Sequence, residues 1–492
     1  MTLRLHDTLS GETTDFEPIG DAVTLYLCGL TTSDPAHLGH ARVWLHTDVL
    51  HRWLEYSGYE VRHVENFTDV NEKVLARVGE VGDSEADVGR HYVAEFLDDM
   101  RSLRLKRATV YPRVTEHVEE VVAMVETLLE KGYAYESNGS VYFDVTSFED
   151  YGKLSGQQID ELEAQGPEDE RSEKRHPADF ALWKADGVGP EEIVEHQHEE
   201  AADPEDACET ALTWDSPWGE GRPGWHIECS AMSTTHLANT FDIHVAGEDL
   251  VFPHNENEIA QAEAATGQPL TNHWLHVGLL ETGDEKMSSS LGNFYTVEEG
   301  IEKFGADVVR TFLLSATYSE KQAYSEAAIE EAQERFERLE RGYERAVAVA
   351  DSPDSKTKVR DDSLRSAVAT AREEFGRAMD DDLNTREAFA ALLELTSAVH
   401  EHLDSYDDAD YQGLRSAIEA YDKLGGGVLG LRFGATEAGD VTIAEELVEL
   451  VLEVREQQRA AGNYEQADEL RADLESIGVE VQDTDEGPEF RL

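Results

Sequence analysis

The chain has 492 residues, of which 40% are hydrophobic and 30% charged, a composition typical of globular rather than disordered or fibrous proteins. Acidic residues dominate, because 105 Asp plus Glu against 41 Lys plus Arg give a net charge of −64. Like charges in this excess repel one another and destabilise the compact state at low salt. At about 1 M salt the Debye length is only roughly 3 Å, so the repulsion would be largely screened. We therefore interpret the acidity as adaptation to a salty cell interior; the alternative is a generally acidic protein that keeps away from nucleic acid.

This length exceeds what one core usually serves, so we expect three or more domains. Three cysteines, at positions 28, 208 and 229, form no disulfide framework and suit a reducing compartment. The first residues have no apolar signal core, and no apolar run approaches the length of a membrane span. We expect a cytoplasmic protein with no membrane partner.

The first informative stretch is the apolar run Val23–Cys28, whose length and β-branched content predict a buried strand. A loop, Thr31–Ala36, follows, and an apolar stripe at helical spacing then runs to Gly58, a typical residue after a helix end. Glu60–Val64 alternates as a second strand. Strand, helix and strand in this order predict a parallel sheet with right-handed crossovers.

The sequence His37-Leu38-Gly39-His40 stands at the head of the predicted helix. A helix N-terminus after a strand and a turn attracts anions. Imidazoles can donate to phosphate oxygens, and Gly39 lets a flat ligand approach the backbone. We interpret this turn as a phosphate site; the alternative is an ordinary first helical turn with surface histidines.

Later segments are assigned more coarsely. We expect mostly helix over Ser84–Glu136, strands at Gly139–Val145, Phe241–Val245 and His273–Leu280, an acidic surface insertion at Gly187–Leu212, and helix from Val297 nearly to the end, with linkers at Asp351–Ser363 and Gly425–Gly439.

Four residues could form a metal site: Cys28, Cys229, His254 and Glu258. His254 and Glu258 are four residues apart on a predicted helix, so their side chains leave the same face. Two sulfurs, a nitrogen and an oxygen favour zinc over calcium or magnesium. The alternative is that the cysteines are ordinary buried thiols.

A loop beyond the last strand carries Lys286-Met287-Ser288-Ser289-Ser290. One ammonium in a mobile loop of small residues suits the charge that develops on a transferring phosphoryl or nucleotidyl group. An ordinary solvated lysine is the alternative.

Together these segments resemble the class I aminoacyl-tRNA synthetases, and within that class the cysteine-specific enzymes. His37–His40 is similar to the first signature of the class and Lys286–Ser290 to the second. Further similar stretches follow in the expected order: Asn66–Asp69, Gly221–Met232, Phe252–Gln261 and Met379–Thr385.

The resemblance implies activation of L-cysteine by ATP, with Mg²⁺, to cysteinyl-adenylate and transfer to tRNA(Cys) by an enzyme that we expect to be a monomer. One Zn²⁺ per chain would select the substrate thiolate. The implied residues are Cys28, Cys229, His254 and Glu258 for zinc; His37, Gly39, His40, Asp249, Lys286 and Ser289 for ATP; Cys28, Thr68 and Trp225 for cysteine; and His37, His40 and Lys286 for catalysis.

The chain departs from the family pattern at three places. Ser289 stands where a second lysine is usual, which reduces the charge at the leaving phosphates. The loop Thr31–Ala36 lacks its customary aromatic residue, and Phe490 replaces a tryptophan near the end.

The predicted fold class is α/β: a Rossmann-like parallel-sheet catalytic domain, split by a connective insertion and followed by a mainly α-helical C-terminal region. The expected boundaries are 1–90 and 215–295 for the catalytic halves, 91–214 for the insertion, 296–335 for a stem-contact region, 336–432 for a helical bundle, and 440–492 for an anticodon-binding domain.

Three other functions share parts of this pattern. A nucleotidylyltransferase would not need Gly221–Met232 or a long helical tail, and a small-molecule cysteine ligase lacks a tRNA-reading domain. A non-catalytic paralogue would not need the intact His37, His40, Lys286 and zinc set. The net charge disfavours nucleic acid at low salt, so we place tRNA recognition on local cations of the C-terminal helices, Arg455, Arg459 and Arg471, with Arg491 near the end.

Overall fold

The computed structural model describes residues 2–159, 172–185, 187–198, 200–282, 285–286, 295–405 and 408–434, together with short stretches between 451 and 491. The chain divides into two compact units, residues 1–431 and residues 432–492. Among the helices in these ranges, none combines the length and the apolar run needed to cross a membrane.

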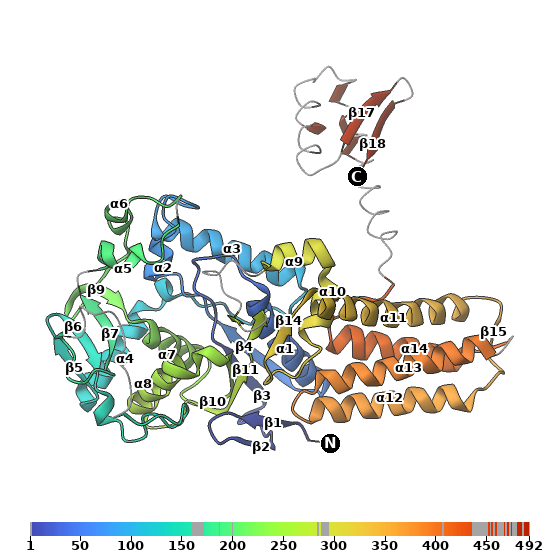
Figure 1. The fold of residues 1–492 in the computed structure, drawn as a ribbon, viewed down its shortest axis with the longest axis horizontal. Helices are drawn as coiled ribbons and strands as arrows, with labels where there is room; N and C mark the ends of the chain where they lie inside the picture. Colours follow the sequence, from blue (N-terminus) through green and yellow to red (C-terminus); the bar gives the residue numbers. More distant parts are fainter. Residues whose placement is uncertain are drawn as a thin grey trace. The chain divides into compact units, whose positions relative to one another are not determined.

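A four-stranded parallel sheet forms the centre of the first unit, in the order β11-β10-β3-β4 (Figure 1). The strands are β3 (Ala22–Leu27), β4 (Glu60–Glu65), β10 (Phe241–Gly247) and β11 (Thr271–Val277). The chain leaves β3 toward β4 on one side and reaches β10 on the other side much later. The carboxyl ends of β3 and β10 therefore flank a topological switch point, where open α/β sheets bind ligands.

Helix α1 (Leu38–Tyr56) connects β3 to β4 and buries Leu45, Val49 and Leu54 completely or nearly so. Its end is fixed by Gly58, whose φ of 94° lies in the left-handed region that glycine adopts without strain. The predicted strand, helix and strand are thus confirmed.

The insertion contains a five-stranded antiparallel sheet, in the order β5-β6-β7-β9-β8. Its core includes Val125, Phe143 and Phe180, and it packs on Ile227 and Ala260, which follow the insertion in the sequence. The elements that follow β4 as far as Pro223 are α2 (Glu72–Leu75), α3 (Glu85–Ser102), α4 (Val118–Lys131), β5 (Ala134–Ser137), β6 (Ser140–Phe143), β7 (Phe180–Ala185), α5 (Pro190–Val194), α6 (Pro204–Cys208), β8 (Trp214–Ser216) and β9 (Gly219–Pro223).

After the insertion the chain continues through α7 (Trp225–His236), a short turn η6 (Val251–Asn255) and α8 (Glu256–Thr266). Strands β12 (Leu280–Thr282), β13 (Glu285–Lys286) and β14 (Gln322–Tyr324) form a small sheet. Helices α9 (Val297–Phe304) and α10 (Ala306–Leu313) lie between β13 and β14 in the sequence. Strand β14 interrupts the continuous helical region that the sequence predicts from Val297 onward.

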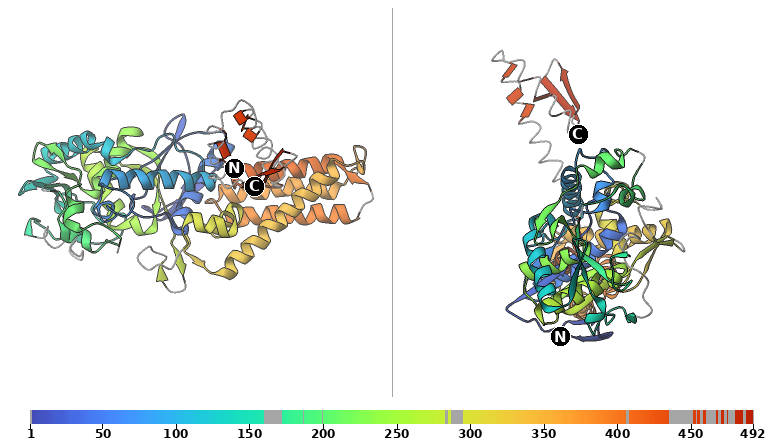
Figure 2. Two further views of the ribbon diagram at one scale, coloured as in Figure 1. Left: turned by 90° about the horizontal axis from the view of Figure 1, so that it is seen from above. Right: turned by 90° about the vertical axis from the view of Figure 1, so that its left-hand side faces the viewer.

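Four helices then run side by side as a bundle (Figure 2): α11 (Glu326–Ala350), α12 (Asp362–Asp380), α13 (Thr385–Ser405) and α14 (Tyr411–Ala420). The bundle is tied to the sheet by the buried Arg310, which donates to Asp48 (2.6 Å) on α1 and to the carbonyl of Leu429.

The predicted linker at Gly425–Gly439 begins too early. Gly425, Gly426 and Gly427 belong to the helical segment η8 (Tyr421–Val428), where Leu424 and Gly425 are buried. Three glycines read locally as a flexible linker, but packing against the bundle overrides their low helix propensity. The second unit ends in the antiparallel strands β17 (Glu480–Thr484) and β18 (Gly487–Arg491).

Candidate active site

Four side chains from separate segments converge beside the switch point. Cys28 directly follows β3, where its backbone N–H donates to the Val245 carbonyl of β10 (3.0 Å). Cys229 lies one turn inside α7, while His254 and Glu258 lie in η6 and α8. All four side chains are buried, and one ligand atom from each lies within 4.8 Å of the other three.

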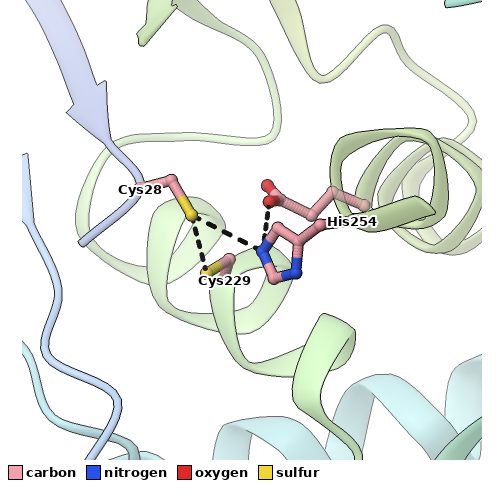
Figure 3. A group of neighbouring side chains, drawn as sticks. Cys28, Cys229 and His254 are labelled. Atoms are coloured by element: carbon pink, nitrogen blue, oxygen red, sulfur yellow. Dashed lines mark hydrogen bonds and ion pairs between the residues drawn. The ribbon is translucent and has the colours of Figure 1, made fainter. Parts of the chain in front are cut away.

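The individual distances suit a shared cation. Cys28 Sγ lies 3.7 Å from Cys229 Sγ and 3.5 Å from His254 Nε2, which in turn lies 2.9 Å from Glu258 Oε1 (Figure 3). Zinc in proteins takes cysteine sulfur, histidine nitrogen and carboxylate oxygen as ligands. The donor set and its burial therefore fit zinc, and the sequence-predicted metal set is brought together in full.

The electrostatics of the cluster agree with this fit. Burial alone would lower the pKa of His254, but hydrogen bonding to Cys229 and Glu258 raises it to about 10. Hydrogen bonding to Cys28 and burial raise the pKa of the Cys229 thiol well above its ordinary value. Thiolates at this site would therefore need a nearby cation, and metal binding provides that charge.

A second layer of polar groups orients the candidate ligands. His244 Nε2 lies 2.9 Å from Glu258 Oε2, and Asn255 Nδ2 donates to Glu258 Oε1 (3.0 Å). His226 Nδ1 lies 3.0 Å from His254 Nδ1. Such partners fix the orientation of metal ligands and tune their basicity.

The first signature turn closes on itself. His37 and His40 stack with ring centroids 3.7 Å apart, and the backbone N–H of His40 donates to His37 Nδ1 (3.2 Å). This first-turn amide is thus capped by the protein itself. A Cβ at Gly39 would lie 2.8 Å from the His37 ring, so glycine is needed here to accommodate that ring.

The remaining predicted residues lie at different depths. Thr68 is buried, and its backbone N–H donates to the Leu30 carbonyl (3.0 Å). Trp225 is 39% exposed, with its ring centroid 4.6 Å from that of His254, so it lies beside one residue of the candidate metal cluster. Asp249 is exposed just after β10. The Lys286 backbone lies in β13, but its side chain and all of Ser289 fall outside the described residues.

Comparison with known proteins agrees with this geometry. Residues 16–334 match the family model for the tRNA synthetases class I (C) catalytic domain, and residues 374–434 match the DALR domain. The chain is 65% identical to a cysteine–tRNA ligase of Haloarcula marismortui, with all of both chains covered. The chain belongs to the cysteine–tRNA ligase family of class I synthetases.

Other members of this family are similar over nearly the same length. The cysteine–tRNA ligase of Halobacterium salinarum is 58% identical over all of both chains, and that of Thermococcus onnurineus is 41% identical over 99% of this chain and 98% of that one. Among solved structures, a Mycobacterium tuberculosis methionyl-tRNA synthetase bound by methionyl-adenylate aligns with a TM-score of 0.59. It is 17% identical and covers 83% of this chain and 92% of its own. The predicted fold class and family are confirmed.

For this cysteine–tRNA ligase family member, sequence reasoning missed the second layer of the cluster. His226 and Asn255 each precede a ligand, Cys229 and Glu258, by three residues on the same helical stretch. Since residues three apart share a helix face, that spacing could have pointed to both. His244 lies on β10, and no local signal relates it to Glu258.

Proposed function

We propose that the chain activates L-cysteine with ATP and Mg²⁺ to cysteinyl-adenylate, releases pyrophosphate, and transfers the cysteinyl group to tRNA(Cys). The observation that carries the proposal is the buried cluster of Cys28, Cys229, His254 and Glu258 at the switch point. The full-length similarity to cysteine–tRNA ligases supports the same activity.

The cluster residues would hold one Zn²⁺, with His244 and Asn255 keeping the Glu258 carboxylate in place. Bound zinc supplies a soft Lewis acid that prefers the thiolate of cysteine to the hydroxyl of serine. Trp225 and Thr68 would border the amino-acid pocket, and the ring of Trp225 would shield His254, against which it lies. A pocket specific for one substrate group can reject the analogue without editing.

Adenylation requires that the two substrates are positioned correctly and that the negative charge of the departing pyrophosphate is stabilised. The carboxylate of cysteine is ionised at neutral pH and attacks the α-phosphate without a general base. His37 and His40 would contact ATP at the start of α1, where the stacked rings are held by their mutual capping. Asp249 would lie near the ribose, and Lys286, with Ser289, would neutralise the departing pyrophosphate.

We assign residues 296–335 to contact with the acceptor stem of tRNA and residues 440–492 to contact with its anticodon. Residues 336–432, which form the helical bundle, lie between these two regions in the sequence. Arg455 is only 2% exposed, so its side chain is not accessible for base reading. Arg459 and Arg471 are half-buried and remain candidates. A chain ending at Leu431, the boundary of the first unit, should retain cysteine activation and lose tRNA affinity; undiminished affinity would contradict this assignment.

The acid excess supports a high-salt habitat, and the similarity to proteins of Haloarcula and Halobacterium agrees with it. We therefore expect activity to need molar KCl. Location in the cytoplasm and a monomeric state stay predictions; the three free cysteines support the first.

The decisive experiment is cysteine-dependent ATP–pyrophosphate exchange in molar KCl, with serine as the control substrate, followed by charging of tRNA. Cys229→Ser should lose zinc and cysteine activation together, whereas Cys208→Ser, which changes the third cysteine, should keep both. Exchange without charging would favour the small-molecule ligase instead, and retained activation in zinc-free Cys229→Ser would refute the selector role.

A further inference from the structure

The loop Thr31–Ala36 joins the metal cluster to the ATP turn, because it runs from Cys28 to His37. Its first half is fixed to the predicted cysteine pocket. The backbone N–H of Thr32 donates to the Thr68 carbonyl (3.0 Å), and the Thr32 hydroxyl donates to the same oxygen (3.3 Å). Thr32 and Ser33 are buried.

The second half of the loop is held from the opposite side by Arg77. Its guanidinium donates to Asp34 Oδ1 through Nη2 (2.7 Å) and through Nε (3.0 Å). The hydroxyl of Ser33 donates to the other oxygen of Asp34 (2.9 Å). The Arg77 side chain is only 6% exposed and that of Asp34 only 19%, so water screens this ion pair weakly.

The same guanidinium also contacts the acidic insertion. Arg77 Nη1 donates to the carbonyl of His196, in the segment that follows α5. The described insertion lies beside α2 (Figure 1), where the backbone N–H of Ala202 donates to the Val78 carbonyl (2.8 Å). A Cβ at Gly79, whose φ is +88°, would come within 2.7 Å of Ala202, so this approach requires glycine.

His198 adds an outer contact to this joint. Its ring lies 3.2 Å from Glu80 and 3.9 Å from Asp34, but its side chain is 50% exposed. An exposed pair of this kind contributes little. The buried guanidinium of Arg77 is therefore the part of the joint that fixes the loop.

We propose that Arg77 is a positioning residue for adenylation, which sets the loop Thr31–Ala36 by fastening Asp34 to the insertion; the proposal rests on the proposed function. Arg77 touches no substrate in this role. It fixes the separation between the cluster that selects the thiol and the turn that binds ATP, and thereby aligns the substrate carboxylate with the α-phosphate. In this way His196 and Ala202 of the insertion, which contact Arg77 and Val78, would affect catalysis without touching a substrate.

The test compares Arg77→Met, Arg77→Lys and the native chain in cysteine-dependent pyrophosphate exchange in molar KCl. A misplacement of about 1 Å can cost on the order of 100-fold, so we expect Arg77→Met to lower kcat by about that factor. The KM values for ATP and cysteine should stay within about threefold, since each half-site is intact, and zinc content should be unchanged. The kcat of Arg77→Lys should lie between those of Arg77→Met and the native chain. One ammonium group cannot donate to both Asp34 and the His196 carbonyl, as the forked guanidinium does.

Arg365→Met is the matched control. Arg365 pairs with the buried carboxylate of Asp410 (2.6 Å) in the helical bundle, so this variant loses an equally close ion pair far along the chain from the loop. We expect a lower Tm and a native kcat.

Native kcat in Arg77→Met, or an equal loss of kcat in Arg365→Met, would overturn the positioning role. Zinc lost together with kcat would also overturn it, because the effect would then lie in the metal cluster. Should Arg77→Met not fold, Asp34→Asn carries the same test with the same expected loss of kcat. A native chain that exchanges no pyrophosphate with cysteine would instead refute the proposed function.

Discussion

Glu65, at the end of β4, is a carboxyl group in the core of the catalytic sheet. It is 3% exposed, and its Oε1 accepts a hydrogen bond from the indole N–H of Trp44 (2.8 Å). Burial raises the pKa of Glu65 to about 8, against the smaller lowering effect of that hydrogen bond. The folded protein therefore keeps this proton at neutral pH, whereas the unfolded chain releases it.

The sign of the pH effect follows directly. Below the ordinary pKa of 4.5 both states are protonated, so Glu65 has no effect on the pH dependence there. Between 4.5 and about 8 the folded state binds more protons, so its stability falls as pH rises. At about 1.4 kcal/mol per pH unit, the free energy of unfolding falls by at most roughly 5 kcal/mol across this range.

Glu65→Gln removes the titration but keeps an oxygen that can accept from Trp44. We expect the free energy of unfolding of Glu65→Gln, relative to that of the native chain, to rise between about pH 5 and about pH 9 by an amount that approaches roughly 5 kcal/mol. Urea unfolding in molar KCl, followed by tryptophan fluorescence, measures it. Glu60→Gln, at the exposed start of the same strand, should differ from native by less than about 0.5 kcal/mol throughout. A difference between Glu65→Gln and the native chain that is constant with pH would refute the reasoning.

Three further predictions follow from buried contacts. Arg310→Met should lower the free energy of unfolding by about 3–5 kcal/mol, because it removes a fully buried partner of Asp48; thermal unfolding measures this. Gly39→Ala should displace the His37 ring, which an added Cβ would meet at 2.8 Å, and lower kcat for pyrophosphate exchange by about 10- to 100-fold with zinc retained. His244→Ala should weaken zinc binding by about 10- to 100-fold, because a ligand carboxylate loses its orienting partner; competition with a chelator measures it.

Matched variants separate these effects from general damage. Arg372→Met removes an exposed pair on the bundle surface and should leave Tm nearly unchanged, so a loss equal to that of Arg310→Met would argue against burial as the cause. Gly376→Ala adds a Cβ whose nearest neighbour is Trp53 at 3.9 Å, an ordinary contact, and should keep the native kcat. A native kcat in Gly39→Ala as well would show that the His37 ring can move without harm. Native zinc affinity in His244→Ala would show that the carboxylate is held by other contacts.

Local patterns carried much of the fold prediction. The apolar run of β3, the helical stripe of α1 and the glycine at position 58 are all short-range signals, and the predicted ends of the strand and the helix lie within two residues of the observed ends. The pair His254 and Glu258 was also predictable from helical spacing. The glycines of η8 were misinterpreted because their environment is tertiary: Leu424 beside them is buried against the bundle.

The loop Thr31–Ala36 marks the limit of such reasoning. In the sequence, Ser33-Asp34-Pro35 is a typical turn, and such side chains often satisfy their own backbone. In the structure the Asp34 carboxylate is taken by Arg77, 43 residues further along, and that guanidinium also reaches a carbonyl 119 residues beyond itself. Neither contact can be predicted from a periodic pattern in the sequence, because both depend on how α2 and the insertion pack against the sheet. The polar side chains of Thr32 and Asp34 therefore find partners in segments that are distant in the sequence. In the role proposed for Arg77, the separation between the metal cluster and the ATP turn therefore depends on the insertion, which belongs to neither of them.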